Sequence, residues 1–418
     1  MEPVPLTGPD RHHQLAIGIS LALIGILVAL TALELALRLS GYHRQFAQRD
    51  ATIGYVLTPN FARSVPILEH AGGSVLFRTN NLGLRRNTHT ASVKPAGTLR
   101  ILVLGDSQTE GMVNNEETYS AGLERALNEV PVVQERQRKV EVLNAAASGY
   151  SPLLEYLWLR ERGRALKPDL VLLALYAGND IGELLMHYED FGGFGPRFAL
   201  PFLEQTNSGW HIEPPGTDAG AWGCVDRSLQ THLRVYALVR RVLPRSQPPD
   251  DKTFQRVLAR CSGCAQSMWQ AFVAHGDPSA LAGAFSKLDY LLMQFQIESA
   301  QLKAPLVVMI IPSKLEVEAE RTTGVPQAMA ACGLRYDAIA FDAAVRRRII
   351  ALAEDHGIVT VDLQPSLRAA ALERGQPLFW QLDWHLDVEG HRVVTQQLLP
   401  VVSRLLHVEL PTPSTTFN

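Results

Sequence analysis

The sequence places a serine where a nucleophile could act. Ser107 is the last residue of the triplet Gly105-Asp106-Ser107. This triplet begins at the end of the apolar run of residues 100–105 (RILVLG). A short apolar run that ends in glycine is typical of a strand buried on both faces. A serine at the carboxyl end of such a strand lies at the sheet edge where ligands bind. Its hydroxyl becomes a nucleophile once a base removes its proton.

The triplet by itself does not decide the chemistry. Roughly half of such Gly-Asp-Ser triplets form ordinary turns. The sequence also has no Gly-x-Ser-x-Gly elbow, which would indicate a nucleophile of the α/β-hydrolase type. The assignment of Ser107 as a nucleophile therefore depends on support from other segments of the chain.

Strands and helices alternate on both sides of Ser107. Short apolar runs predict strands, and apolar residues at helical spacing predict helices between them. This alternation predicts a parallel sheet with helices on both faces, which is a three-layer α/β/α domain. The expected strands are residues 100–105, 140–144, 169–175, 305–311 and 358–363, and the expected helices are residues 118–127, 153–166, 336–356 and 388–407.

Four segments together resemble the signature blocks of the SGNH (GDSL-esterase-like) serine hydrolases, in the order that the family shows. The resemblance covers roughly residues 51–407 and implies a flavodoxin-like α/β/α fold. Residues 54–83 also resemble the leader between anchor and hydrolase domain in membrane-bound bacterial members. The four segments are residues 104–127 (LGDSQTEGMVNNEETYSAGLERAL), residues 144–152 (NAAASGYSP), Gly178-Asn179-Asp180 and Asp383-Trp384-His385.

The resemblance implies a role for each of five residues. Ser107 would be the nucleophile, His385 the base, and Asp383 the acid that orients the imidazole. The family pattern assigns the oxyanion donors to the backbone N–H groups of Ser107 and Gly149 and to the side-chain amide of Asn179. A glycine suits this position because a residue without Cβ lets the backbone approach a substrate. No cofactor and no metal is implied.

One position departs from the common family pattern. The acid usually lies three residues before the histidine, but that position is Leu382. Asp383 lies two residues before His385, a spacing that resembles relatives acting in exopolysaccharide acetylation. The departure makes acyl transfer to a sugar the alternative to hydrolysis.

Polar residues beside the motifs have structural interpretations. Asp106 is expected to hold its turn through side-chain hydrogen bonds. Asp180 and Asp387 each precede an expected helix, and we predict that they cap these helices rather than act in the chemistry. His391 lies inside the last expected helix and is interpreted as structural.

An N-terminal stretch predicts a membrane anchor at residues 15–38. Residues 15–33 carry no charge, and only Ser20 and Thr31 are polar. About 20 apolar residues in a helix span a hydrocarbon core of ~30 Å. A cleaved signal peptide usually has a shorter apolar stretch of ~7–15 residues and a small-x-small site. No Ala-x-Ala triplet follows before Glu34, so an uncleaved single anchor is favoured.

The side of the membrane on which the domain lies is indicated by two opposing signals. More arginines follow the span than precede it, which favours a cytoplasmic domain, although long domains translocate despite such charges. The even number of cysteines is compatible with two disulfides in an oxidising compartment, which favours an extracytoplasmic domain. A zinc site and free thiols remain alternatives. The cysteines are Cys224, Cys261, Cys264 and Cys332.

The long interval between the third and fourth expected strands predicts an inserted, largely helical subdomain, with a lid or a partner surface as its alternative roles. The predicted organisation is a flank at 1–14, the anchor at 15–38, a leader at 51–99, the first part of the hydrolase domain at 100–190, an inserted cap at 191–302, the second part at 303–408, and a disordered tail at 409–418.

Composition excludes other classes of protein. Hydrophobic residues make up 46% and charged residues 19% of the chain, which is typical of a globular core. The net charge is −3, and no basic stripe indicates a nucleic-acid partner. The run Arg346-Arg347-Arg348 lies in a helical pattern and is interpreted as a solvated face.

The residues therefore predict a membrane-anchored serine esterase acting on O-acyl esters of a cell-envelope glycan or lipid. The first alternative is an O-acyltransferase that uses the same triad, with a membrane acyltransferase as a candidate partner. The second is a silent binding protein, in which Ser107 and Asn179 are turn residues and His385 packs in a loop.

Overall fold

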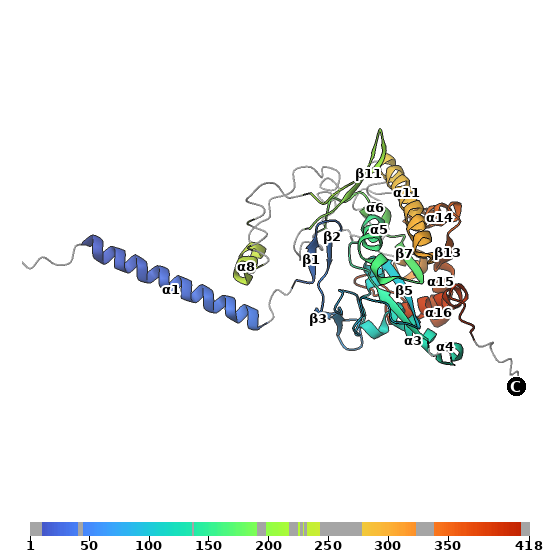
Figure 1. Cartoon of the computed structure of the whole chain (residues 1–418), viewed down its shortest axis with the longest axis horizontal. Coiled ribbons are helices and arrows are strands. Elements are labelled where there is room, and N and C mark those ends of the chain that lie inside the picture. The colour runs from blue at the N-terminus through green and yellow to red at the C-terminus, as the bar shows by residue number, and fades with distance from the viewer. Residues whose placement is uncertain are drawn as a thin grey trace, which may run out of the picture. The chain divides into compact units, whose positions relative to one another are not determined.

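The computed structural model describes most of the chain, and Figure 1 shows its elements. All four cysteines, the predicted tail after residue 410 and most of the middle of the predicted insertion lie outside the described residues. The described residues are 11–40, 45–135, 138–189, 198–216, 225, 229, 232–242, 278–322 and 338–410.

The centre of the domain is a parallel five-stranded sheet, as the alternation of elements predicts. Its order is β13-β12-β7-β5-β6, which numbered along the chain is the flavodoxin-like order 2-1-3-4-5 read from its far edge. The connections reverse direction between β5 and β7, and in such sheets ligands bind at that switch point. The strands are β5 (Thr98–Gly105), β6 (Lys139–Asn144), β7 (Leu170–Tyr176), β12 (Leu306–Ile311) and β13 (Val359–Asp362).

Helices cover both faces of the sheet because its strands are apolar on both sides. Along β5, Ile101 and Val103 pack into one hydrophobic cluster, while Leu102 and Leu104 pack into the other. One face is covered by α5 (Pro152–Glu161), α11 (Pro278–Leu302) and α14 (Ala338–Asp355), and the other by α3 (Tyr119–Asn128), α15 (Gln364–Arg374) and α16 (Val388–Leu405).

The expected strands and helices are confirmed, with most ends shifted by one or two residues. The expected helix 153–166 is shorter, because α5 ends at Glu161 and a 3₁₀ turn follows it. Helix α11 lies inside the range predicted as a cap, and its apolar face, including Leu288 and Phe295, is part of the core on α5.

The leader folds onto the same core as two antiparallel hairpins. Ile53, Tyr55 and Leu84 are fully buried in the cluster that contains β5 and α5. The hairpins are β1 (Ala47–Asp50) with β2 (Gly54–Leu57) and β3 (Ala62–Pro66) with β4 (Ser74–Arg78).

Short elements complete the domain. The described part of the insertion contributes two further hairpins, β8 (Tyr188–Glu189) with β9 (Phe198–Ala199), and β10 (Phe202–Thr206) with β11 (Gly209–Glu213). The remaining short helices are α2 (Ser107–Glu110), η1 (Asn115–Glu117), α4 (Pro131–Glu135), η2 (Gly163–Leu166), α6 (Asp180–Glu183), α12 (Lys314–Val317) and η4 (Ala319–Arg321).

A separate compact unit contains α1 (Arg11–Leu39) and α8 (Arg234–Val242). Within α1, residues Gln14–Leu39 have a mean hydropathy of 2.6 and are long and apolar enough to cross a membrane. A signal sequence near an N-terminus can also reach this length and hydropathy. Helix α8 is joined to α1 by a hydrogen bond from the Val235 N–H to the Glu34 carboxylate, at 2.9 Å.

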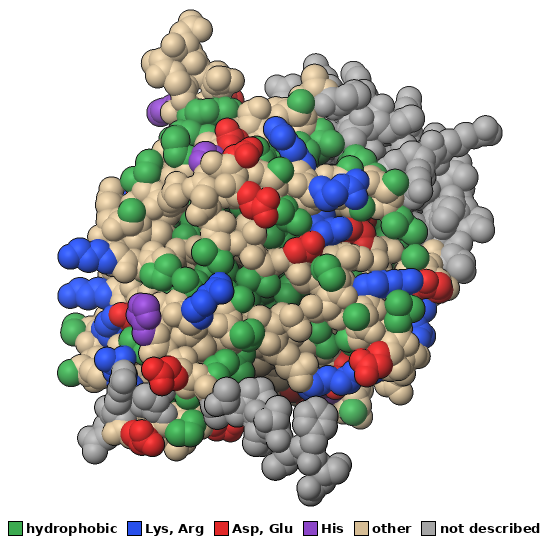
Figure 2. All heavy atoms as spheres, turned by 90° about the vertical axis from the view of Figure 1, so that its right-hand side faces the viewer, with side chains coloured by type: hydrophobic (Ala, Val, Ile, Leu, Met, Phe, Trp, Pro, Cys, Tyr) green, Lys and Arg blue, Asp and Glu red, His purple; other side chains and the backbone are tan. Residues whose placement is uncertain are grey.

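The prediction that Arg346-Arg347-Arg348 forms a solvated face is wrong for Arg346. Arg346 is buried and pairs with Glu316 at 2.8 Å and with Asp362. Successive helical residues are about 100° apart, so Arg346 faces the core while its two neighbours are exposed. On the face drawn in Figure 2, basic and acidic side chains are interspersed rather than gathered by sign.

A buried arginine fastens the start of β5. Arg100 is fully buried, and its Nε donates to Glu141 on the neighbouring strand at 3.0 Å. Its Nη1 and Nη2 donate to the backbone carbonyls of Leu166, at 3.0 Å, and Ala91, at 2.6 Å. The guanidinium thereby links the leader, the sheet and the turn after α5.

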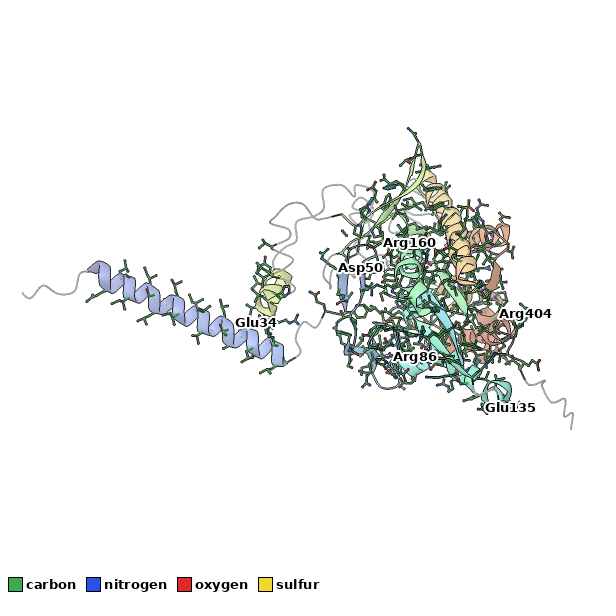
Figure 3. The ribbon with its side chains drawn as sticks, in the orientation of Figure 1. Glu34, Asp50, Arg86, Glu135, Arg160 and Arg404 are labelled. Atoms are coloured by element: carbon green, nitrogen blue, oxygen red, sulfur yellow. The ribbon has the colours of Figure 1, made fainter. Side chains whose placement is uncertain are left out.

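We expect Arg100→Met to lower the free energy of unfolding by about 3–5 kcal/mol, because it leaves the buried Glu141 carboxylate without its main partner. Urea denaturation of the full chain in detergent, followed by tryptophan fluorescence, measures this. The control is Arg404→Met at an exposed position on α16 (Figure 3), which should change stability by less than about 0.5 kcal/mol. Equal losses in the two variants would contradict the assigned role of Arg100.

Candidate active site

Ser107 lies where β5 gives way to the one-turn helix α2. Asp106 is the N-cap of this helix, and its carboxylate accepts a hydrogen bond from the Gln108 N–H at 2.9 Å. This agrees with the structural role expected for Asp106. Gly105 is required sterically, since a Cβ there would lie 2.5 Å from the Thr109 Oγ1. The tight turn leaves the Ser107 side chain partly exposed while its neighbours are buried.

His385 reaches Ser107 from the loop that precedes α16. Its Nε2 lies 2.8 Å from the Ser107 Oγ, within hydrogen-bond distance. The two residues are 278 positions apart in the sequence. A serine hydroxyl bonded to an imidazole is the arrangement in which a base activates a serine nucleophile.

Asp383 is also present beside the imidazole, but its contact is longer. Its Oδ1 lies 3.6 Å from the His385 Nδ1 and accepts a hydrogen bond from the His385 backbone N–H at 3.1 Å. Because the acid is only two residues before the histidine, one oxygen serves both the backbone and the ring. The contact with the ring is therefore an ion pair rather than a hydrogen bond of normal length.

The charges around His385 favour its protonated form. Burial disfavours the imidazolium, but the nearby Asp383 carboxylate, with smaller contributions from Asp106 and Glu110, outweighs it and raises the pKa of His385 above 6.5. Burial also opposes ionisation of Asp383, yet His385 and Lys314 hold the pKa of its carboxyl below 3.8. An acid that stays ionised beside a base with a raised pKa is the electrostatic pattern of a nucleophile–base–acid triad.

The two other predicted residues follow the neighbouring strands. Gly149 lies in the turn after β6 with φ +77°, a conformation that favours glycine. No hydrogen bond between described residues uses its N–H. Asn179 is the N-cap residue of α6, directly after β7, and its Nδ2 donates to the Glu183 Oε1 at 2.8 Å. Ser107, Gly149 and Asn179 thus lie at the carboxyl ends of three adjacent strands.

The predicted roles of the other polar residues are mostly correct. Asp387 is the N-cap of α16 and accepts from the Gly390 N–H at 2.8 Å. His391 is fully buried in that helix, where burial lowers its pKa to about 3. The prediction for Asp180 is wrong. It is the first residue of α6 rather than its cap, and its carboxylate accepts from the Tyr176 N–H at the end of β7, at 2.8 Å.

The loop of residues 378–386, which carries His385, is held by residues that the sequence did not reveal. Gln108, next to the nucleophile, donates to the Trp384 carbonyl at 3.1 Å and accepts from the Leu386 N–H at 3.0 Å. Trp384 has φ +65°, which is strained for a bulky side chain and is kept by these bonds.

Three charged residues hold the first half of this loop. Glu69, from the hairpin β3–β4, accepts from the backbone N–H groups of Gln381 at 2.7 Å and Leu382 at 2.9 Å. Lys314 donates to the Trp380 carbonyl at 3.0 Å, and Glu318 accepts from the N–H groups at the loop's start. No local pattern marks these residues, because each acts on a segment distant in the sequence.

Buried carboxyl groups lie behind the site. Burial is the main cause that raises the pKa of Asp106 to about 6 and of Glu110 to about 7. Burial, with nearby carboxylates adding to it, holds the pKa values of Glu155 and Asp180 well above their usual values. Among the described residues, no group of histidine, cysteine or acidic side chains has the geometry to hold a metal ion.

Comparisons with known proteins were made for the whole chain. No family model and no curated protein matches it. Among solved structures it is similar to LAE5, an α/β hydrolase enzyme from the metagenome of Lake Arreo, Spain, at 14% identity and a TM-score of 0.36 over 73% of this chain and 96% of that one. It is also similar to an acetyl xylan esterase, AlAXEase, at 12% identity and a TM-score of 0.37 over 73% of this chain and 100% of that one.

A third similar structure is Axe2, an acetylxylan esterase from Geobacillus stearothermophilus, at 13% identity and a TM-score of 0.37 over 75% of this chain and 97% of that one. Likeness at these TM-scores does not establish an activity for this chain. The chemistry of the site therefore rests on its own residues and distances.

We expect Glu155→Gln to flatten the pH dependence of stability. The pKa of Glu155 is raised in the folded state, so the folded chain binds more protons than the unfolded chain, and stability falls as pH rises above 4.5. Glutamine has no proton to lose. The difference in unfolding free energy between pH 5 and pH 8 should therefore be smaller in Glu155→Gln than in the wild type, by more than the roughly 0.5 kcal/mol expected of a substitution at an exposed position.

Urea denaturation at the two pH values measures this difference. The control is Glu373→Gln at an exposed position of α15, which should leave it unchanged within about 0.5 kcal/mol. A slope in Glu155→Gln equal to that of the wild type would show that Glu155 ionises normally in the folded chain.

Proposed function

We propose that this protein is a serine esterase that hydrolyses O-acyl esters, such as acetyl esters, of a cell-envelope glycan or lipid. The observation that carries the proposal is the 2.8 Å contact between the Ser107 Oγ and the His385 Nε2 at the switch point of a parallel sheet. The resemblance of four separate segments to SGNH hydrolases supports it, since those segments supply Ser107, Gly149, Asn179, Asp383 and His385.

The first half of the reaction forms an acyl-enzyme. His385 Nε2 takes the hydroxyl proton as the Ser107 Oγ attacks the ester carbonyl carbon. The tetrahedral intermediate collapses when the C–O bond to the alcohol breaks, and His385 returns the proton to the departing oxygen. Asp383 stabilises the imidazolium throughout and itself stays ionised.

The second half releases the acid. Water attacks the acyl-enzyme while His385 removes one of its protons, and the proton then passes to the Ser107 Oγ as the acyl–oxygen bond breaks. In both halves the carbonyl oxygen becomes negative and needs donors aimed at it. The backbone N–H groups of Ser107 and Gly149 and the side-chain amide of Asn179 are the proposed donors, and losing one typically costs about 10²–10³ in rate.

Acyl transfer is the second candidate function. Its support is the Asp383-Trp384-His385 spacing, with the acid two residues before the histidine. A sugar hydroxyl would replace water in the second half, with the same three residues in the same roles. Incubation with an acetylated donor and an acceptor glycan, followed by mass spectrometry, separates the two functions by their products.

The substrate class follows from a proposed location. If α1 spans the membrane as an uncleaved anchor, the domain is held near acylated glycans and lipids of the envelope. We place the domain on the extracytoplasmic side, with a membrane acyltransferase as a partner in the case of acyl transfer. Protease accessibility of the domain in spheroplasts tests this topology.

We expect a fluorophosphonate probe to label the purified full-length protein covalently at Ser107. Labelling should disappear in Ser107→Ala and fall by at least about 10³-fold in rate in His385→Ala, because both the nucleophile and its base are required. Ser403→Ala, at a buried serine on α16, is the matched control and should label normally. A folded wild-type protein that does not label would favour the silent binding protein instead.

We expect kcat/KM for p-nitrophenyl acetate to fall as pH drops through the pKa of His385, with a midpoint above 6.5, because the base must be neutral. Asp383→Asn should lower this midpoint, since the main interaction that raises the pKa of His385 would be lost while burial would still oppose its protonation. It should also reduce kcat by about 10²–10⁴-fold.

The control for this pH profile is Asp387→Asn, which alters the other acid near His385 in the sequence. Asparagine still caps a helix, so both kcat and the midpoint should remain those of the wild type. A shift in Asp387→Asn but not in Asp383→Asn would transfer the role of the acid to Asp387.

A further inference from the structure

The peptide bond between Ser148 and Gly149 carries one of the proposed oxyanion donors. A peptide unit is planar and trans, so its C=O and N–H point in opposite directions. Fixing the direction of the Ser148 carbonyl therefore fixes the direction of the Gly149 N–H. Gly149 has φ +77°, and a hydrogen bond from the Tyr150 N–H to the Ala147 carbonyl, at 3.1 Å, closes the turn around this peptide.

Two buried side chains from different parts of the domain hold Ser148. Tyr55 bonds the carbonyl of the Ser148–Gly149 peptide itself, whereas Glu110 bonds the N–H and the hydroxyl of Ser148, which precede that carbonyl. The Tyr55 hydroxyl, from strand β2 of the leader, donates to the Ser148 carbonyl at 2.5 Å. The Glu110 carboxylate, at the end of α2, accepts from the Ser148 N–H at 3.1 Å and from the Ser148 hydroxyl through the same oxygen. Helix α2 also begins with Ser107, so Glu110 ties the turn to the nucleophile's own helix.

Both side chains are themselves fixed by packing. Tyr55 is fully buried, and its ring stacks on Phe198 at 4.9 Å between centroids. Tyr150, from the same turn, donates its hydroxyl proton to the Tyr55 carbonyl at 2.8 Å. Arg85, also from the leader, donates to the backbone carbonyl of Glu110 at 3.1 Å. The two side chains that hold Ser148 are thus each held by further contacts of their own.

We propose that Tyr55 and Glu110 are positioning residues that orient the Ser148–Gly149 peptide so that the Gly149 N–H faces the oxyanion formed on Ser107. The inference rests on the proposed esterase function and extends it into the leader. The two residues touch no substrate. Tyr55 acts through the Ser148 carbonyl, and Glu110 acts through the N–H and hydroxyl of Ser148, besides the small contribution of its charge to the pKa of His385. An interaction that strengthens in the transition state affects kcat more than KM.

The first test is Tyr55→Phe, which removes one hydroxyl and keeps the ring. With p-nitrophenyl acetate as substrate, kcat should fall by about 10- to 100-fold while KM changes by less than about 3-fold, because a misdirected oxyanion donor loses part of its effect. The matched control is Tyr156→Phe, a buried tyrosine on α5 whose hydroxyl lies 3.5 Å from Gln294. The control should keep the wild-type kcat.

The second test compares two substitutions of Glu110 and does not depend on Tyr55. Glu110→Gln keeps an acceptor oxygen for both Ser148 bonds, so its kcat should exceed that of Glu110→Ala by about 10- to 100-fold. Both variants lack the charge that acts on His385, so the difference between them reports the Ser148 bonds alone. Rescue by the amide is a result that a merely structural carboxylate would not give. Thermal unfolding of each variant confirms that the compared proteins are folded.

The outcomes separate this inference from the proposed function. If the wild type is labelled by the fluorophosphonate probe but folded Tyr55→Phe and Glu110→Ala keep the wild-type kcat, the inference is overturned and the esterase proposal stands. A rise in KM with kcat unchanged in either variant also overturns it. If the wild type is not labelled, both proposals fail together.

Discussion

The hydrogen bond between Ser107 and His385 is the contact on which the arrangement of the site depends. The serine end is held by a buried strand and a capped turn, but the histidine end lies on a loop without regular structure. Ordering such a loop costs about 1–2 kcal/mol of backbone entropy per residue, which must be met by contacts elsewhere. Gln108, which is next to the nucleophile, offsets part of this entropy loss because it forms hydrogen bonds with the loop on both sides of His385. Glu69, Lys314 and Glu318 hold the first half of the same loop, so the distance between the two reacting groups depends on several side chains that lie far from His385 in the sequence.

Burial around this contact also lowers the stability of the fold, because it encloses several carboxyl groups. Asp106, Glu110, Glu155 and Asp180 lie behind the sheet edge, where burial opposes ionisation of each carboxyl. A core built for stability alone would hold apolar side chains there. Asp106 and Glu110 nevertheless contribute to keeping the imidazolium of His385 stable. Stability given up in this layer thus supports the electrostatics of the site, a compromise that is common where a structure must position charge.

Much of the architecture follows from local sequence patterns. The strands are apolar on both faces and the helices have regular spacing, so residues 100–105 and 388–407 indicate their structures without knowledge of any partner. The motif residues Ser107, Gly149 and Asn179 follow strands, and parallel strands bring their carboxyl ends to one edge. A local sequence pattern does not predict the environment of a residue whose partner lies far away in the sequence. The burial of Arg346 depends on Glu316 and Asp362, and the bond from Tyr176 to Asp180 depends on how β7 ends.

Residues of the leader contact the candidate site, although they lie outside the signature motifs. The signature blocks start near residue 104, which suggests that the chemistry needs nothing before β5. Yet Glu69 holds the loop of His385, and Tyr55 holds the peptide of Gly149. Each bond joins the leader to a backbone group rather than to a catalytic side chain, and a backbone partner leaves no sequence signature. The leader therefore belongs to the compact unit that contains the candidate site, and that unit begins at Phe46.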